Sequence, residues 1–252
     1  MAEERRGRTA TTAAWRMGGL ALGVAASALV LQTGALGRGE LLAAPVFALG
    51  VLAGVLPGEV TVEAPSHGRR EASLTQRRIL DYMPRTLGLV VALDLLLLVA
   101  LLVATSLSGS AADLGRPGRS LARSCGDGTG WAGGPWPGTY YTLPLAALVA
   151  VGVAGTAITL RLVCRRPRVG NVETDTATRR ASAAVVVAGC GILVAIPLAG
   201  IALTAAAQLH DAPCGPGWWP ATALALLVTA LAQLVLLAAC ARKLLPRPNL
   251  GS

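Results

Sequence analysis

Five cysteines and a single acidic residue within an apolar segment are the side chains of this sequence that could do chemistry. Two of the cysteines, Cys125 and Cys214, lie in similar stretches, SCGDGTGWAGGPWPG and PCGPGWWPA, that each precede a long apolar segment. On an oxidising side of a membrane, where the topology below places them, such a pair favours a disulfide over two free thiols. With His210 and Asp211 the pair could also bind a metal. The chain lacks the CxxC and HxxxH spacings of metal sites, so we expect no metal.

Asp94 stands in the middle of a long apolar segment, VALDLLLLV. A carboxyl group at such a position is costly in lipid and points to a functional site. Asp94 follows Arg85 by nine residues and Gln233 precedes Arg242 by nine. At 1.5 Å per residue both lie roughly 13 Å from the same membrane surface. We predict that Asp94 and Gln233 face the interior and form a hydrogen bond. Asp94 could carry a proton or a cation, or the pair could be structural, which the lack of other intramembrane acids favours.

Sequence motifs for catalysis or cofactor binding are lacking. The chain has no Walker lysine loop, no GxSxG and no HExxH, and no acidic pair suited to acid/base chemistry in the loops predicted outside the membrane. Its two histidines, His67 and His210, fall on opposite sides of the predicted membrane. We therefore expect no enzyme activity, no catalytic residue and no cofactor.

The composition is that of a membrane protein. Hydrophobic residues make up 54% of the 252 residues and charged residues 14%, about half the charged share of an average soluble domain. The formal net charge is +9, but the basic residues are dispersed over short connections without a basic domain, so we expect no binding to nucleic acid. One lysine stands against 21 arginines, which is typical of a high-GC bacterium.

The apolar segments predict an all-α, polytopic bundle of six transmembrane helices that forms a single transmembrane domain over residues 1–252. Residue 57 is a proline, expected to close the second and shortest span, which could instead be tilted or re-entrant. Residues 57–85 form the longest cytoplasmic loop in this prediction, and residues 108–140 form a Gly- and Pro-rich extracytoplasmic loop. The predicted spans are 14–32, 41–56, 86–107, 141–163, 181–206 and 220–241.

The basic residues predict the orientation. Eighteen arginines and lysines fall at the two termini and in the second and fourth connections, and four fall in the other connections. Because short cytoplasmic loops carry the excess of positive charge, both termini are expected in the cytoplasm, with the chain in the cell (plasma) membrane. Losing the second span would place Arg69 to Arg85 on the wrong side, so the charge pattern supports six spans.

Spans three and four resemble spans five and six. Each pair begins after a cytoplasmic Thr-x-Arg-Arg or Thr-Arg-Arg, passes through a Cys-Gly loop with tryptophans, and ends in a cysteine followed by basic residues. One interpretation is a tandem duplication of a helical hairpin with parallel repeats. The other is that Ala-, Leu- and Val-rich helices with basic ends look alike.

In span number, terminal location and length, this architecture is similar in overall shape to the permease subunits of multidrug-type ABC exporters. That resemblance implies a transport component. A second form of the same alternative is a small carrier that uses Asp94 to bind a proton or a cation. We expect instead a multi-pass bacterial membrane protein that is not an enzyme and acts through partner proteins in the cell envelope. Its surroundings would be the lipid bilayer and either protein partners or further copies of itself.

Overall fold

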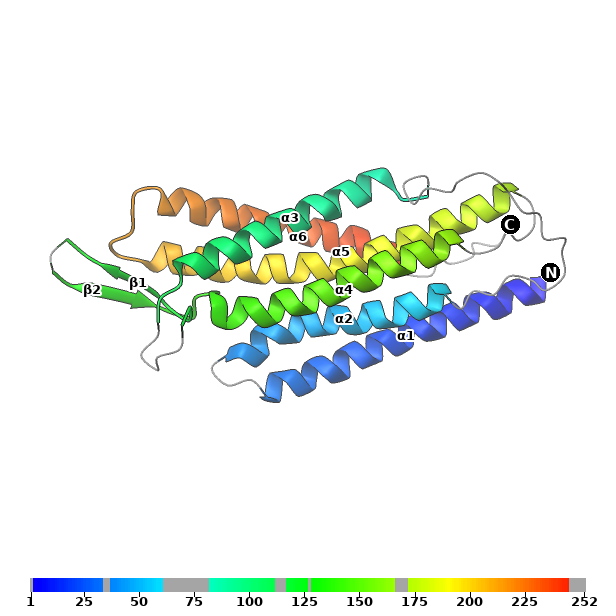
Figure 1. Ribbon diagram of the computed structural model, residues 1–252, viewed down its shortest axis with the longest axis horizontal. Coiled ribbons are helices and arrows are strands. Elements are labelled where there is room, and N and C mark those ends of the chain that lie inside the picture. Colours follow the sequence, from blue (N-terminus) through cyan, green and yellow to red (C-terminus); the bar gives the residue numbers. More distant parts are fainter. Residues whose placement is uncertain are drawn as a thin grey trace.

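Six long helices run side by side along the molecule, and a β-hairpin projects from one end (Figure 1). We call this the hairpin end; α1 begins near the other, which we call the opposite end. The computed structural model describes residues 2–33, 37–60, 82–111, 117–126, 128–165 and 172–244. The elements are α1 (Ala2–Thr33), α2 (Arg38–Val60), α3 (Arg85–Ser108), β1 (Leu121–Ser124), β2 (Gly130–Gly133), α4 (Thr139–Arg165), α5 (Val172–Asp211) and α6 (Trp219–Leu244).

All six helices are long and apolar enough to cross a membrane, which confirms the all-helical class and the six predicted segments. The prediction for the second segment was wrong in its length. The helix α2 continues through Pro57 to Val60, so its apolar part, Arg38–Glu59, has 22 residues. A proline removes one backbone hydrogen bond but does not force the residues after it out of the helix. Of the loop predicted at 57–85, residues 61–81 lie outside the described part of the chain.

The helix α5 forms the centre of the bundle. In its most apolar stretch 78% of the residues are buried, and it packs against α2, α3, α4 and α6. Small side chains make this possible, because Ala, Val and Gly dominate the segment AVVVAGCGILVA. The helix α1 is peripheral: 11% of its apolar stretch is buried, and its main contacts are with α2.

Glycines on both helices hold α1 against α2. A Cβ atom on Gly19 would lie 2.6 Å from Gly54 Cα and 2.9 Å from the Gly50 carbonyl oxygen, and one on Gly23 would lie 2.7 Å from the Phe47 oxygen. Each helix therefore presents a GxxxG motif, and the two motifs face one another with their backbones in contact. The sequence analysis missed this pairing, although both motifs can be read from the sequence.

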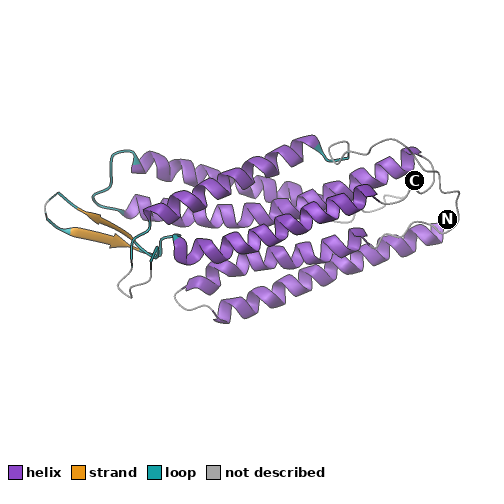
Figure 2. Ribbon diagram, viewed as in Figure 1, coloured by secondary structure: helices purple, strands orange, loops and turns teal. Residues whose placement is uncertain are grey.

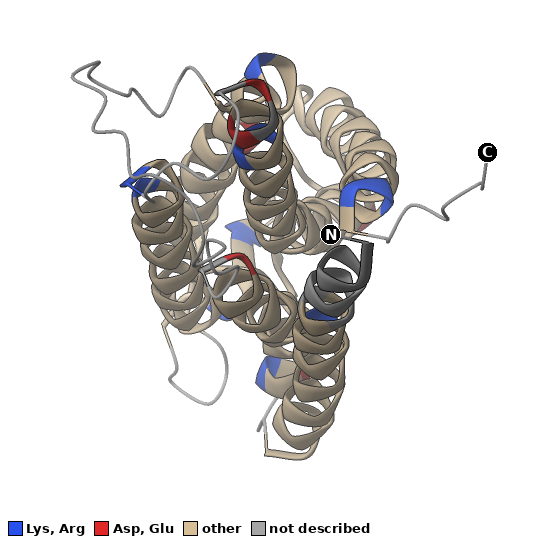
Figure 3. Cartoon of the chain, turned by 90° about the vertical axis from the view of Figure 1, so that its right-hand side faces the viewer, with Lys and Arg blue, Asp and Glu red and all other residues tan. Residues whose placement is uncertain are grey.

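The outer surfaces of α1, α3, α4 and α6 carry many exposed leucines and valines, which indicates a lipid environment. Figure 3 shows the molecule from the opposite end. Charged residues lie on the near ends of several helices, and the rest of the helical surface is largely uncharged. This distribution fits helices that cross an apolar layer and end in polar surroundings.

The loop predicted at 108–140 contains the β-hairpin, which the sequence analysis did not predict (Figure 2). Its strands pair antiparallel from Leu121 with Gly133 to Ser124 with Gly130. Trp136 then fixes the hairpin to the bundle, because its indole N–H donates to the Thr105 carbonyl at the end of α3 at 2.8 Å. Trp136 is 4% exposed, so this hydrogen bond is buried.

The proposed duplication of spans three to six is not confirmed. α5 and α6 pack along one another, whereas α3 and α4 have few direct contacts and are joined mainly through α5. The two hairpins are therefore packed differently within the bundle.

Candidate functional site

Two helices that both pack on α5 bring Asp94 and Gln233 together. Asp94 lies near the middle of α3 and Gln233 near the middle of α6, and the backbones of these helices have little direct contact. The side chains close the gap, since Gln233 Nε2 donates to Asp94 Oδ1 at 3.3 Å. Gly191 of α5 helps to set this spacing: a Cβ atom there would lie 2.7 Å from Cys240 Sγ on α6 and 3.1 Å from Val91 on α3.

The hydrogen-bonding capacity of this pair is only partly used. The one hydrogen bond that the pair forms within the described residues, at 3.3 Å, is longer than the usual range for N–H···O. Gln233 is 3% exposed, and its Oε1 has no hydrogen-bond partner among the described residues. A buried amide oxygen without a donor costs free energy, so this position favours a group that can donate to it.

Asp94 lies at the edge between the core and the outer surface. It is half-buried, and Val90 and Leu97, which lie one turn away on the same face of α3, are 43% and 44% exposed. Gln233, in contrast, faces the core. A group approaching α3 from within the lipid layer could therefore reach the Asp94 carboxyl without opening the bundle.

One buried thiol lies near the pair, and a second lies near the first. Cys240 of α6 lies close enough to Asp94 and Cys190 to interact with both, and Cys190 of α5 forms a hydrogen bond with Thr156 of α4. No group of three or more His, Cys, Asp and Glu side chains that could hold a metal occurs within the described residues. The arrangement is thus a set of oxygen acceptors with neighbouring thiols, suited to receiving a hydrogen-bond donor or a cation.

Comparison with known proteins adds no further constraint on this site. No family model, curated protein or solved structure matches the chain. The chemistry of its own residues is therefore the basis for assigning a function.

The second feature that the sequence singled out lies at the hairpin end. Cys125, directly after β1, and Cys214, in the connection between α5 and α6, are joined by a disulfide with their Cα atoms 5.6 Å apart. The bond links the β-hairpin covalently to the connection that follows α5, and the two cysteines are 89 residues apart in the sequence. It is reinforced by Arg123, whose guanidinium carbon lies 5.4 Å from the centroid of the Trp219 ring.

We expect this disulfide to form in the membrane-inserted protein. Denatured, unreduced protein should be alkylated at the three cysteines outside this bond, Cys164, Cys190 and Cys240, and reduced protein at all five, as measured by the mass added. A disulfide typically stabilises a protein by about 2–4 kcal/mol, and we expect a contribution of that size here. The matched control is Cys125→Ser, which frees Cys214 and should make it reactive without reductant. Equal alkylation of the native chain with and without reductant would rule the bond out.

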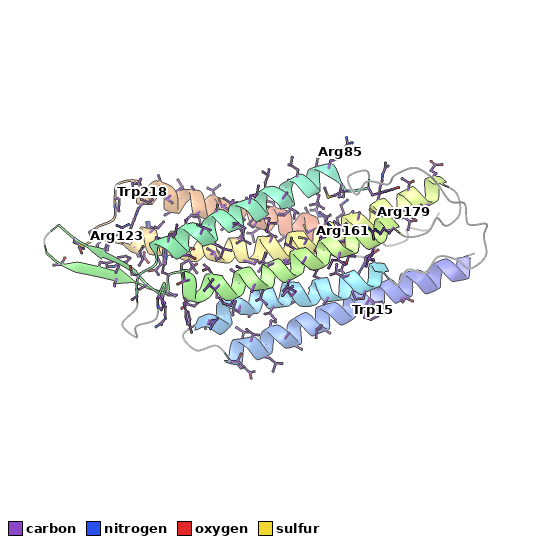
Figure 4. The ribbon with its side chains drawn as sticks, viewed as in Figure 1. Trp15, Arg85, Arg123, Arg161, Arg179 and Trp218 are labelled. Carbon is purple, nitrogen blue, oxygen red and sulfur yellow. A yellow bond between two sulfur atoms is a disulfide. The ribbon has the colours of Figure 1, made fainter. Side chains whose placement is uncertain are left out.

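Aromatic residues gather at the hairpin end, but not as a lipid-facing belt. From the sequence alone, the tryptophans and tyrosines that flank the apolar segments here are expected to lie at the membrane interface, at the level of the lipid headgroups. Instead Trp136, Tyr141 and Trp219 are 4%, 2% and 2% exposed, so the protein itself covers them. Trp218 is 59% exposed and remains a candidate interface residue, as does Trp15 of α1 at 44% (Figure 4). The buried rings stabilise the disulfide-bonded cap, which hydropathy alone could not show.

Two ion pairs at the opposite end escaped the sequence analysis. Arg16 of α1 pairs with Glu59 of α2 at 2.8 Å, and its other terminal nitrogen donates to the Leu244 carbonyl of α6 at 3.0 Å. Arg179 of α5 pairs with Asp175 at 2.8 Å and is 3% exposed. In the sequence Arg16 and Arg179 were only two of the basic residues that were counted for the orientation. Nothing in that count distinguishes a buried arginine from a solvated one.

Proposed function

We propose that this chain is a non-enzymatic, multi-pass protein of a bacterial cell membrane that acts through a partner membrane protein. The orientation that accompanies this proposal places both termini and the opposite end in the cytoplasm and the hairpin end outside. It is supported by the eighteen basic residues that the termini and two connections carry, against four elsewhere. The contact between Arg16 and the end of α6 supports a common side for both ends of the chain.

The orientation predicts the result of a reporter experiment. A reporter that is active only outside the cytoplasm should be inactive when fused after residue 252 and active when inserted at Gly128 of the hairpin loop. Gly128 suits an insertion because nothing lies within 4 Å of the position that its Cβ would occupy. The reverse pattern of activity would overturn the orientation and leave the six spans intact.

The observation that carries the proposed function is the half-buried Asp94 with its unused hydrogen-bonding capacity. Asp94 receives one long hydrogen bond, and the buried Gln233 Oε1 beside it receives none from the described residues. A carboxyl group within the lipid layer is stabilised by a donor, and the exposed Val90 and Leu97 lie on the same face. A partner helix with a basic or donor side chain at this depth would supply the donor and cover both apolar side chains.

A cross-linking experiment tests this function. A photo-reactive residue at Leu97 should give an adduct with another membrane polypeptide, and Asp94→Asn should reduce the yield by about tenfold or more, since losing one charge of a desolvated pair costs about 2–5 kcal/mol. Asparagine keeps an acceptor for Gln233 Nε2, so the bundle should stay folded. The matched control is a photo-reactive residue at Leu29 of α1, which is 63% exposed and belongs to a helix that packs mainly on α2.

Adducts that form equally well in the native chain and in the Asp94→Asn variant would remove the basis for a partner at this face. The unpartnered Gln233 Oε1 also favours a second candidate, a carrier that binds a proton or cation at Asp94. In that case reconstituted vesicles should show a flux that Asp94→Asn abolishes, with no adduct from Leu97. The cavity described below does not include Asp94 among its lining residues, which favours the partner-binding function.

A further inference from the structure

A partly open cavity of about 280 Å³ lies between α2, α4 and α5 at the hairpin end. Most of its wall is apolar, including Leu41, Trp136, Leu145, Ile196 and Ile201. Prolines lie in two of the wall helices, Pro45 in α2 and Pro197 in α5, and each of them removes one intrahelical hydrogen bond. The volume is near the lower end of small-molecule sites and suits part of an apolar chain.

The cavity extends from the hairpin end into the membrane layer. On α5 its lining runs from Thr204 to Ile196, eight residues earlier and therefore about 12 Å deeper. On α2 it runs from Glu40 to Pro45, in the opposite chain direction and towards the same depth. One end of the cavity is thus lined by polar side chains and the other by apolar ones. A ligand that matches this lining has a polar head and an apolar chain.

Two arginines near the polar end have unused donors. The Nε atoms of Arg38 and Arg119 are buried and have no hydrogen-bond partner among the described residues. Arg38 follows the lining residue Gly37, and its guanidinium carbon lies 5.0 Å from the Tyr140 ring centroid. Arg119 is fixed beside the cavity because its carbonyl accepts the backbone N–H of Trp136 at 2.9 Å. Buried guanidinium donors without an acceptor favour an anionic group, and phosphate fits them well.

Glu40 adds the opposite charge at the same end. It lines the cavity, and no ion pair joins it to a basic side chain within the described residues. A purely anionic ligand would be repelled by this carboxylate, whereas an ammonium group would be stabilised by it. The polar end therefore presents cationic donors and an anionic acceptor over an apolar cavity.

We propose that this cavity binds one zwitterionic phospholipid of the phosphoethanolamine type from the leaflet at the hairpin end. The phosphate accepts hydrogen bonds from Arg38 and Arg119, and the ammonium group donates to Glu40. The upper part of one acyl chain lies against Leu145, Ile196 and Ile201. This assignment does not depend on the partner-binding function, since the two sites share no residue.

Native mass spectrometry of the purified full chain with equal amounts of phosphatidylethanolamine and phosphatidylglycerol of matched chains tests the proposal. The native chain should retain phosphatidylethanolamine about tenfold better, the effect of one charge-assisted contact. Glu40→Gln should remove that preference, and Arg38→Gln with Arg119→Gln should weaken both lipids. Arg123→Gln is the matched control, an arginine at the same end that stacks on Trp219 instead of lying beside the cavity, and it should leave retention unchanged.

Gly200→Leu tests the cavity without altering any charge. Gly200 lines the cavity, and nothing lies within 4 Å of the position its Cβ would occupy, so a leucine side chain can start there without meeting a neighbour, and we expect it to take up cavity space. This variant should keep the thermal stability of the native chain and lose the retained lipid. Retention by Gly200→Leu equal to that of the native chain would place the lipid elsewhere. A native chain that prefers phosphatidylglycerol, or retains the two lipids equally, would overturn the zwitterionic assignment.

Discussion

Arg179→Met is expected to destabilise the bundle by about 3–5 kcal/mol, the cost of removing one partner from a buried ion pair. Arg179 is 3% exposed, and its guanidinium donates to both carboxylate oxygens of Asp175, at 2.8 and 3.2 Å. It also donates to the carbonyls of Val163 and Cys164 at 2.7 and 3.0 Å. Those carbonyls belong to the last turn of α4, where no intrahelical donor is available. One side chain therefore links α5 to the end of α4.

The neighbouring arginine is a matched control for this prediction. Arg180 is exposed, so Arg180→Met should change the free energy of unfolding by less than about 0.5 kcal/mol. Both variants lose one positive charge from the same turn, so a difference between them reports burial and hydrogen bonding and not net charge. The measurement is unfolding in mixed micelles with increasing denaturing detergent. Equal stabilities for the two variants would contradict the buried geometry of Arg179.

A second arm separates the ion pair from the capping of α4. Changing Asp175→Leu together with Arg179→Met removes both charges and should recover part of the loss, because no uncompensated charge then remains. The carbonyls of Val163 and Cys164 would still lack their donor, so recovery should be incomplete. Full recovery would show that the cap contributes nothing.

Gly19→Leu is expected to separate α1 from α2 and to cost about 3 kcal/mol, the upper end of the range for overpacking. The new side chain would begin 2.6 Å from Gly54 Cα and 2.9 Å from the Gly50 oxygen. These atoms are backbone and cannot rotate away, so one helix must move. Since α1 packs mainly on α2, we expect α1 to detach while the remaining helices stay folded.

The adjacent glycine provides the control. Nothing lies within 4 Å of the position that a Cβ atom on Gly18 would occupy, and this residue is exposed. Gly18→Leu gains the same helix propensity as Gly19→Leu without the clash, so its stability should match or slightly exceed that of the native chain. Cross-linking between cysteines introduced into α1 and α2 measures the detachment. Efficient cross-linking in Gly19→Leu would contradict the paired GxxxG interface.

The predicted and observed helices agree in number and place because hydropathy responds directly to the lipid environment. A run of about 20 apolar residues must form a helix there, whatever its neighbours are. The limits of the helices depend on other contacts, which hydropathy does not include. α2 extends beyond Pro57 to Val60, and the side chain of Glu59 in this extension pairs with Arg16 of another helix.

Part of the candidate site could also be read from the sequence. The equal depths of Asp94 and Gln233 suggested a contact, and the structure has them 3.3 Å apart. Depth says nothing about rotation, so the sequence alone could not show that Asp94 lies at the lipid-facing edge while Gln233 faces the core. The cavity beside Trp136 also could not be predicted from the sequence, because three helices and the base of the hairpin form it together.

By itself, the sequence determined that the chain has six apolar helices, where along the chain they lie, and how its charges divide between the connections. The number and places of the helices depend on each segment's own free energy of transfer into lipid, and the division of charges is given directly by the positions of arginine and lysine. Only the tertiary structure decided that α5 is central, that Gly19 faces Gly54, and that Arg179 is buried while Arg180 is exposed. Those outcomes depend on how helices rotate and pack against one another. Segments of Ala, Leu and Val leave that choice to a few small and polar residues.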